Sequence, residues 1–359
     1  MTSESAVLRP PSRRERSPSM RAAVIEAKKT LGARSVPVPE LKNGEALIRV
    51  MYCGICGSDI HVYHGDHPTA RFPVVPGHEF VGELVAMRDN GESALSKGDL
   101  VVAQPFFSCG NCQPCAKGRD NVCRSLRFMG VHVDGGFAEY VRVPIRKMYA
   151  VPPGVGAELA ALTEPVAVAV HDVRRSGLKA GETVLVIGGG AIGLLIAIVA
   201  RHSGAGTIVV SEPNVYRRGV AEELGFMTVD PLSPDFDRTL MAETGSLGFD
   251  CVFEASGSRP GFAASTKYAK ITGKVMVIGM TKEPYPVDLS AVFAKELVLE
   301  GVRIHSQYNF IGALELLRKD SLRREFNRLI TDVFPFEKVA DAFAFAESGG
   351  DFMKVLVKM

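Results

Sequence analysis

The chain has 359 residues, of which 46% are hydrophobic and 23% are charged, with 36 glycines and 21 prolines. This length exceeds what one core usually supports and the composition is that of a packed globular protein, so we expect two domains. The formal net charge of +2 excludes a strongly basic surface for nucleic acid or an anionic membrane. No membrane span is expected either, because that needs roughly 18 or more consecutive apolar residues.

Residues 1–19 carry the positive excess of the chain. The charged residues of this segment are Glu4, Arg9, Arg13, Arg14, Glu15 and Arg16, which sum to +2 and so account for the whole net charge of +2. The segment contains several prolines and lacks the apolar core of a secretory signal. We expect a disordered leader, with a translation start at Met20 as the open alternative, and a cytoplasmic location.

The next part of the chain is rich in short β-type runs. From Met20 to about residue 151, runs such as residues 46–50 are separated by closely spaced glycine and proline, and helical periodicity is scarce. This pattern favours an all-β, barrel-like domain. We place that domain at residues 20–173.

Beyond Pro152 and Pro153 the pattern changes. Apolar runs at residues 183–187, 207–210, 251–253 and 274–278 alternate with amphipathic stretches. Strand and helix alternation of this kind predicts an α/β domain with a parallel sheet covered on both faces, here residues 174–309. Residues 310–359 end in a strand at 355–357, and we expect them to return to the first domain.

A glycine-rich segment follows the first of these strands directly. It reads Gly188-Gly-Gly190-Ala191-Ile192-Gly193 and opens a helical run at residues 191–202. Glycines at a strand-to-helix turn let the backbone approach a pyrophosphate, and the amides of the helix N-terminus bind its charge. We therefore predict that Gly188, Gly190, Ala191, Ile192 and Gly193 bind a dinucleotide. A tight turn under a packed helix is the alternative.

The strand after the glycines ends in an acidic residue, Glu212. A carboxylate about twenty residues beyond the glycines accepts hydrogen bonds from a ribose 2′-hydroxyl and repels a 2′-phosphate, which favours NAD over NADP. Arg217 is expected to bind the cofactor; it or Arg218 could fold over the adenine ribose, and pairing of either with a phosphate is the alternative. The strand ends at 256–257 and 279 should present backbone to the cofactor, with the nicotinamide near Gly279, Val302 and Arg303.

Four of the seven cysteines lie close together, at Cys109, Cys112, Cys115 and Cys123. Four thiolates fill the tetrahedral coordination of Zn²⁺ and leave no position for a substrate, so we predict a structural zinc site. Free core thiols and disulfides are the alternatives. Cys53 and Cys251 lie in strand-like patterns and are expected to be core thiols.

A second, dispersed set consists of Cys56, His78 and Glu79. Thiolate, imidazole and carboxylate are acceptable zinc ligands that leave a coordination position open, although each residue alone is also common in a core or on a surface. Glu164 lies in the apolar stretch 159–170, where an unpaired carboxylate is costly to bury. It therefore needs a partner, for which zinc or zinc-bound water is a candidate.

Several motifs occur together in order: Gly54-Ile-Cys56-Gly-Ser58-Asp-Ile-His61, Pro76-Gly-His78-Glu79, the four-cysteine loop, Asp134-Gly-Gly-Phe-Ala-Glu-Tyr140, Glu164-Pro165 and the Gly188 to Gly193 loop. With them the chain resembles, over residues 20–359, the zinc-containing medium-chain dehydrogenases, the family of alcohol, sorbitol, L-threonine and sugar-acid dehydrogenases. The resemblance implies a GroES-like β-barrel catalytic domain plus a doubly wound Rossmann domain, with the active site between them.

The resemblance also implies roles for individual residues. Cys56, His78 and Glu79 match the catalytic zinc ligands, and Glu164 matches a fourth position that binds the metal directly or through water. Ser58 and His61 match the hydroxyl and imidazole of a proton relay, and Asp59 matches an acid behind the ligands. A turn hydroxyl and a surface imidazole are the alternatives for the relay pair.

A narrower likeness points to a substrate class. Tyr63-His-Gly65 and the segment Phe128-Met-Gly130-Val-His132-Val-Asp134-Gly-Gly-Phe137 are similar to the branch that oxidises L-idonate, L-galactonate or L-gulonate at C5. A carboxylate substrate needs a cation, which Arg127 or His132 could supply, unless both are ordinary loop residues.

The reaction implied is hydride transfer from a secondary alcohol of a polyol or sugar acid to NAD, with two zinc ions per chain, one catalytic and one structural. The alternatives are an L-threonine or simple-alcohol dehydrogenase on the same scaffold, or a catalytically silent NAD-binding homologue. The expected partners are a small-molecule substrate and further copies of the chain, in a homodimer or homotetramer, with no nucleic acid and no membrane.

Overall fold

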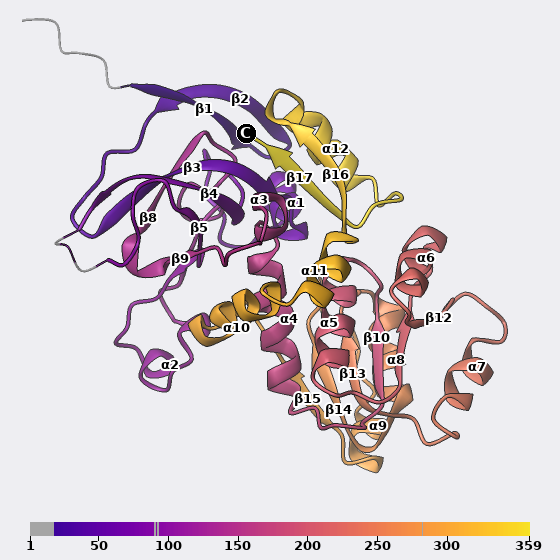
Figure 1. Cartoon of the computed structure of the whole chain (residues 1–359). Coiled ribbons are helices and arrows are strands. Elements are labelled where there is room, and N and C mark those ends of the chain that lie inside the picture. The colour runs from indigo at the N-terminus through magenta and orange to yellow at the C-terminus, as the bar shows by residue number, and fades with distance from the viewer. Residues whose placement is uncertain (1–17, 90, 92, 282) are drawn as a thin grey trace, which may run out of the picture.

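The computed structural model describes residues 18–89, 91, 93–281 and 283–359, which fold around two main sheets (Figure 1). The expected leader, residues 1–19, lies outside the described residues except for Pro18 and Ser19. The first strand, β1, begins at Ser19. Among the described residues, no helix has the length and apolar character needed to cross a membrane.

The β-rich part is built on a seven-stranded sheet. Its order is β16-β17-β3-β4-β5-β9, with β8 also paired to β3, while β1 and β2 form a separate antiparallel pair. The strands are β1 (Ser19–Ala27), β2 (Thr30–Pro37), β3 (Glu45–Gly54), β4 (Glu79–Arg88), β5 (Leu100–Ala103), β8 (Tyr140–Pro144), β9 (Met148–Ala150), β16 (Ile330–Pro335) and β17 (Lys354–Lys358). This confirms the β-rich fold expected for the first part of the chain.

The β-rich part also carries a helix that the sequence pattern did not indicate, α1 (Gly57–His64). It has only eight residues, too few for an amphipathic repeat to stand out. Its ends are set locally: the Asp59 carboxylate accepts the backbone N–H of Cys56 at 2.9 Å, and Gly65 leaves the helix with φ 71°. Short helices α2 (Gln113–Ala116) and α3 (Ala157–Ala160), and α12 (Val339–Glu347), complete this part.

The second part is a six-stranded parallel sheet in the order β12-β11-β10-β13-β14-β15. The strands are β10 (Val184–Ile187), β11 (Ile208–Ser211), β12 (Met227–Val229), β13 (Phe249–Glu254), β14 (Ala269–Val277) and β15 (Val298–Gly301). This doubly wound order confirms the predicted α/β fold, with all four predicted strands present. β12 and β15 were missed because β12 has three residues and β15 is a largely exposed edge strand.

Helices cover both faces of the parallel sheet. Val184 and Val186 of β10 pack with α4 (Thr163–Ser176) and α5 (Ala191–His202), whereas Leu185 and Ile187 face α7 (Phe236–Ala242), α8 (Arg259–Tyr268) and α9 (Leu289–Ala294). Alternate residues of a strand point to opposite faces, so an apolar run on β10 serves two cores. α6 (Val215–Glu223) follows β11 and packs by β12.

The end of the chain returns to the first sheet. β17 pairs with β3 in an antiparallel register that sets Val357 opposite Cys53, and α10 (Gln307–Leu317) packs on α4, followed by α11 (Asp320–Asn327). Figure 1 shows the yellow C-terminal strand beside indigo and purple strands from the N-terminal half. The residue boundaries of the domains, at 173 and 309, stay predictions.

Candidate functional site

Cys56, His78 and Glu79 come together in the structure. One ligand atom from each lies within 4.8 Å of the other two. Antiparallel pairing explains this, because β3 ends at Gly54 directly opposite Glu79, where β4 begins. Cys56, two residues past the end of β3, and His78, one residue before β4, therefore meet.

Asp59 connects the two segments of this set. Its carboxylate accepts the N–H of Cys56 at 2.9 Å and that of Gly77 at 3.0 Å, and it lies 3.5 Å from Nδ1 of His78. Burial lowers the pKa of His78, but the Asp59 carboxylate together with Cys56 raises that pKa well above its usual range. Asp59, itself only 1% exposed, thus fixes both backbone segments and orients the imidazole.

Glu79 has a buried partner that the sequence reasoning missed. The Lys354 ammonium lies 2.6 Å from Oε1 and 2.5 Å from Oε2 of Glu79, and it also donates to the carbonyl of Ile55 at 3.1 Å. Burial lowers the pKa of Lys354, but Glu79, with Cys56 and Glu164, raises it above its usual value. One signal was available: Lys354 directly precedes the apolar run Val355-Leu-Val357 of the terminal strand, where a buried charge needs a partner.

Glu164, at the start of α4, is not among the three residues whose ligand atoms lie within 4.8 Å of one another. Its Oε1 lies 3.4 Å from Nε2 of His305, which is 0% exposed. Burial raises the pKa of Glu164, but His305 and then His78 lower it below its usual value. The carboxylate therefore has the partner that burial requires, and its binding to a metal stays a prediction. His305 was not singled out from the sequence.

Ser58 and His61 both lie on α1. They are three residues apart, so they occupy the same face of the helix, and both are half-buried. The turn that follows α1 is tied to this face, because the N–H of His67 donates to the carbonyl of His61 at 3.2 Å. The structure places the pair beside the segment of Cys56, and the proton-relay role stays a prediction.

The four cysteines form a separate cluster around α2. Ligand atoms of Cys109, Cys112, Cys115 and Cys123 lie within 4.8 Å of one another, and the recorded sulfur–sulfur distances run from 3.4 to 3.8 Å. Four sulfurs at ~2.3 Å from one tetrahedral ion would be about 3.8 Å apart. All four are free thiols, and amide hydrogen bonds from Arg124 and Cys115 lower the pKa of Cys112 to about 6. The donor set thus fits a zinc ion.

The glycine-rich loop lies between β10 and α5. Gly190 caps α5, which spans Ala191–His202, the extent predicted from the sequence. A Cβ at Gly193 would collide with the carbonyl oxygen of Gly188, so the strand and the helix approach as closely as they do only because residue 193 is glycine. The N-terminus of α5 therefore follows the carboxyl end of β10 after three intervening residues.

Glu212 ends β11 beside this loop. Its carboxylate accepts the N–H of Gly189 at 2.7 Å and the N–H of Asn214 at 2.9 Å. Arg218 is occupied, because it donates to the carbonyl of Glu212 and pairs with Asp230 at 3.3 Å. Arg217 lies over the ring of Phe352, 5.6 Å from its centroid, and its buried Nε has no partner among the described residues. Arg217 is therefore the arginine still available to a nucleotide.

Gly279 and Val302 lie at the same edge of the sheet. Gly279 donates to the carbonyl of Glu254 at 2.9 Å, and Val302 donates to the carbonyl of Val277 at 3.2 Å. Glu254, at the end of β13, was not expected from the sequence; it accepts the amides of Ser256 and Gly257, and burial raises its pKa. The cofactor contacts of Gly279 and Val302 stay predictions.

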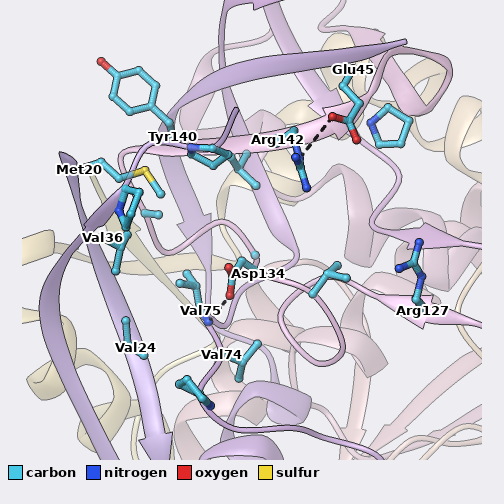
Figure 2. Close-up of a pocket in the computed structure, with 18 of the residues that line it drawn as sticks. Met20, Val24, Val36, Glu45, Val74, Val75, Arg127, Asp134, Tyr140 and Arg142 are labelled. Atoms are coloured by element: carbon cyan, nitrogen blue, oxygen red, sulfur yellow. Dashed lines mark hydrogen bonds and ion pairs between the residues drawn. The ribbon is translucent and has the colours of Figure 1, made fainter. Parts of the chain in front are cut away.

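The two candidates for a carboxylate contact lie in different places. Arg127 lines a cleft of about 620 Å³ beside β1, β2 and β8, whose described lining residues include none of Cys56, His78 and Glu79. Figure 2 shows Arg127 apart from the ion pair of Arg142 with Glu45 in that cleft. His132 lies near His78, because Phe128 contacts His78 with ring centroids 5.0 Å apart and donates its N–H to His132.

Comparisons with known proteins agree with this geometry. Residues 42–153 match the model of the alcohol dehydrogenase GroES-like domain, and residues 191–319 match that of zinc-binding dehydrogenases. The chain is 38% identical over 316 residues to a 2-dehydro-3-deoxy-L-galactonate 5-dehydrogenase of Pseudoalteromonas atlantica, covering 88% of this chain and 92% of the relative. It is 32% identical over 320 residues to an L-threonine 3-dehydrogenase of Pectobacterium carotovorum, covering 87% and 92%.

A solved structure is similar over nearly the whole chain. A putative zinc-binding dehydrogenase from Sinorhizobium meliloti, bound to NADP, superposes with a TM-score of 0.88 at 33% identity and covers 96% of this chain and 100% of its own. The expected fold class, a GroES-like domain with a Rossmann domain, is thereby confirmed. The chain belongs to the zinc-dependent medium-chain alcohol dehydrogenase family and is a dehydrogenase.

Proposed function

We propose that this dehydrogenase oxidises the C5 hydroxyl of a six-carbon sugar acid with NAD. The observation that carries the proposal is the convergence of Cys56, His78 and Glu79, whose ligand atoms lie within 4.8 Å of one another. Thiolate, imidazole and carboxylate from only three residues leave a coordination position for a substrate hydroxyl. The sugar-acid relative named above supports the substrate class, because it is 38% identical to this chain.

The donor set fits a zinc ion on the chemistry of the side chains. Nδ1 of His78 faces the Asp59 carboxylate at 3.5 Å, which leaves Nε2 for a metal ion, and Lys354 holds Glu79 on its far side. A zinc ion held there would supply Lewis-acid polarisation of the substrate hydroxyl. Glu164, held by His305, would lie next to this site and orient the substrate or a water molecule.

The residues of α1 would handle the proton. Oγ of Ser58 would accept the proton of the substrate hydroxyl, and His61 would release a proton to solvent at the other end of the relay. Ser58 and His61 lie on the same half-buried helix face, which supports this route. Gly279 and Val302 would hold the nicotinamide, whose contribution when bound is to take up a hydride.

NAD is favoured by the position of Glu212. Its carboxylate, buried at the end of β11, would accept a ribose 2′-hydroxyl and repel a 2′-phosphate. The similar structure from Sinorhizobium meliloti is bound to NADP, so the cofactor needs a direct test. We expect kcat/KM with NAD to exceed that with NADP, measured at saturating substrate.

The substrate test is a panel of aldonates, alditols and L-threonine with NAD. We expect NADH formation from L-galactonate, L-idonate or L-gulonate, and a lower kcat/KM with the alditols. Turnover of L-threonine alone would favour an L-threonine dehydrogenase instead. This activity is the main rival, because the chain is 32% identical to an L-threonine 3-dehydrogenase. No turnover with any alcohol would favour a catalytically silent homologue.

Two zinc ions per chain are part of the proposal. The four-cysteine cluster and the Cys56 set are separate groups of donors. Metal analysis of the purified protein should give two zinc ions per chain. One zinc ion, lost only on mutation of the four-cysteine loop, would contradict the catalytic site.

A homo-oligomer is the expected assembly. The edge strand β15 exposes Val298 to 49% and Leu299 to 37%, and nearby Leu289 and Phe293 are also exposed. An exposed apolar edge strand is a ready pairing surface for a second copy. Light scattering should give a dimer or tetramer, and a monomer would contradict this part. The free cysteines favour a reducing cytoplasm.

A further inference from the structure

The carboxylate of Glu254 is buried where the parallel sheet meets the glycine-rich loop. Glu254 ends β13, is 0% exposed, and pairs in register with Ile187, the last residue of β10. The glycine-rich loop begins at the next residue, Gly188. No step of the proposed function uses this carboxylate. Burying a carboxylate is costly, so its partners show what it holds in place.

Among the described residues, the hydrogen-bond partners of this carboxylate all donate from the turn that follows β13. The backbone nitrogens of Ser256 and Gly257 each lie 3.1 Å from Oε1, and the Ser256 hydroxyl donates to the same oxygen. That hydroxyl also lies 2.8 Å from the hydroxyl of Ser258, which accepts the N–H of Gly261 at 3.1 Å and so caps α8. The carboxylate therefore fixes the turn and connects it to the start of a helix.

The space around the carboxylate is too small for further side-chain atoms. A Cβ at Gly279 would lie 2.8 Å from Oε2 of Glu254, and a Cβ at Gly261 would lie 2.7 Å from Oε1. The glycine-rich loop is equally close to the turn, because a Cβ at Gly188 would lie 2.9 Å from the backbone nitrogen of Ser256. The turn, the loop and Gly279 thus pack directly against one another, so the position of the turn is coupled to both neighbours.

The strand order decides which half of a bound dinucleotide would meet this turn. β10, which leads into the glycine-rich loop, lies between β11 and β13. A dinucleotide lies across the carboxyl ends of such strands with its pyrophosphate at the glycine-rich loop. Glu212, at the end of β11, marks the adenosine side, so the nicotinamide half would extend over β13, β14 and the segment after β15. Asn121 fixes that last segment by donating to the carbonyl of Arg303 at 2.8 Å. The turn held by Glu254 would therefore lie under the nicotinamide half.

We propose that Glu254 is a positioning residue for the nicotinamide half of the cofactor and acts through the turn that follows β13. This inference rests on the proposed cofactor site but not on the proposed substrate. The buried carboxylate holds the turn at a set distance from the glycine-rich loop and from Gly279, so the nicotinamide half meets strand ends that cannot move apart. Glu212 holds the glycine-rich loop in the same way on the adenosine side, where its carboxylate accepts the N–H of Gly189 at 2.7 Å.

The test compares the binding of NADH with that of ADP, which has the adenosine and the pyrophosphate but no nicotinamide. Both are titrated into the full-length, zinc-containing protein by isothermal calorimetry. For E254A we expect the affinity for NADH to fall at least about tenfold, the effect of losing a hydrogen bond to a charged group, while the affinity for ADP is unchanged. E254Q should keep most of the NADH affinity, because its amide oxygen can still accept both N–H groups of the turn. S256A, at an exposed residue, removes only the hydroxyl contact and should give a smaller loss of the same kind, so the inference stays testable if E254A does not fold.

Two further variants set the scale. E212A, on the adenosine side, should weaken the binding of both ligands, whereas E243A removes an exposed carboxylate at the end of α7 and is the charge-matched control that should bind both like wild type. A loss of affinity in E254A for NADH alone supports the inference. Equal losses for NADH and ADP would overturn it in favour of a general structural role, and an unchanged affinity for NADH would also overturn it.

The conservative variant separates geometry from charge. A loss in E254Q as large as that in E254A would overturn the positioning role in favour of a charge effect on the cofactor. If wild-type protein binds neither NADH nor ADP, the proposed cofactor site fails together with this inference. If wild type binds both and E254A loses both equally, the inference alone fails.

Discussion

The two candidate metal sites of this chain are built in opposite ways. The four-cysteine cluster takes all its donors from residues 109–123, and they are of one chemical kind. The Cys56 set uses three different donors and depends on Asp59 and on Lys354, which lies 275 residues beyond Glu79. A closed site can be made by one loop, whereas an open site needs long-range support that holds the ligands while one position stays free.

The largest expected effect separates the two sites by activity. Cys56→Ala should lower kcat by at least about a thousandfold, since metal polarisation is worth several kcal/mol, while the melting temperature changes little. Cys53→Ala, three residues earlier and also in the barrel, is the matched control and should keep its zinc and its turnover. Turnover by the Cys56 variant would contradict the assignment of Cys56 to a catalytic metal site.

The second effect is on stability. Cys112→Ala should remove the metal of the lobe and lower the melting temperature by about 10 °C, because a lost structural metal is among the most damaging single changes. Thermal unfolding with and without a chelator measures it. If the chelator lowers the melting temperature of wild type but not of this variant, the lobe metal is responsible for the stability. If Cys56→Ala and Cys112→Ala lower the melting temperature equally, the two metal sites do not differ in their contribution to stability.

A third variant tests the long-range support of the open site. Lys354→Met leaves the Glu79 carboxylate buried without its partner and should cost about 3 kcal/mol of unfolding free energy. The double variant with Glu79→Gln should be less damaged than the sum of the two single variants, because the unpaired charge is gone. Urea denaturation of metal-free protein gives both values. An additive result would mean that the pair does not interact energetically.

The smallest effect extends the comparison to the cofactor. The Glu212 carboxylate accepts the N–H groups of Gly189 and Asn214, which lie within 23 residues of it, so its contacts span a much shorter stretch of chain than those of the Cys56 set. Glu212→Ala should lower the preference for NAD over NADP about tenfold through weaker NAD binding, the effect of one lost hydrogen bond to a charged group. Kinetics with both cofactors give the ratio, and an unchanged preference would refute the role.

The same contrast decides what the sequence could predict. Motifs whose partners are neighbours in the chain were readable, including the four cysteines, the loop at Gly188 and the extent of α5. Cys56 and His78 meet because β3 pairs with β4. Their meeting followed only from the resemblance, because the sequence of a strand does not indicate which strand it pairs with.

Contacts between distant segments could not be predicted from the sequence. Lys354 with Glu79 and His305 with Glu164 each join segments more than a hundred residues apart. A buried charge signals that a partner exists, as Glu164 did, but not which residue it is. The helix α1 was missed for another reason, since its ends are set by Asp59 and Gly65 rather than by a hydrophobic repeat.

The hydrogen bond from Asn121 to the carbonyl of Arg303 gives the cysteine loop a second consequence. Asn121 lies two residues before Cys123, so the segment that carries Arg303 is fastened to the lobe as well as to its own sheet. A lobe that lost its metal would therefore also loosen one tie on the segment of Val302 and Arg303, at the edge of the parallel sheet where the nicotinamide is expected.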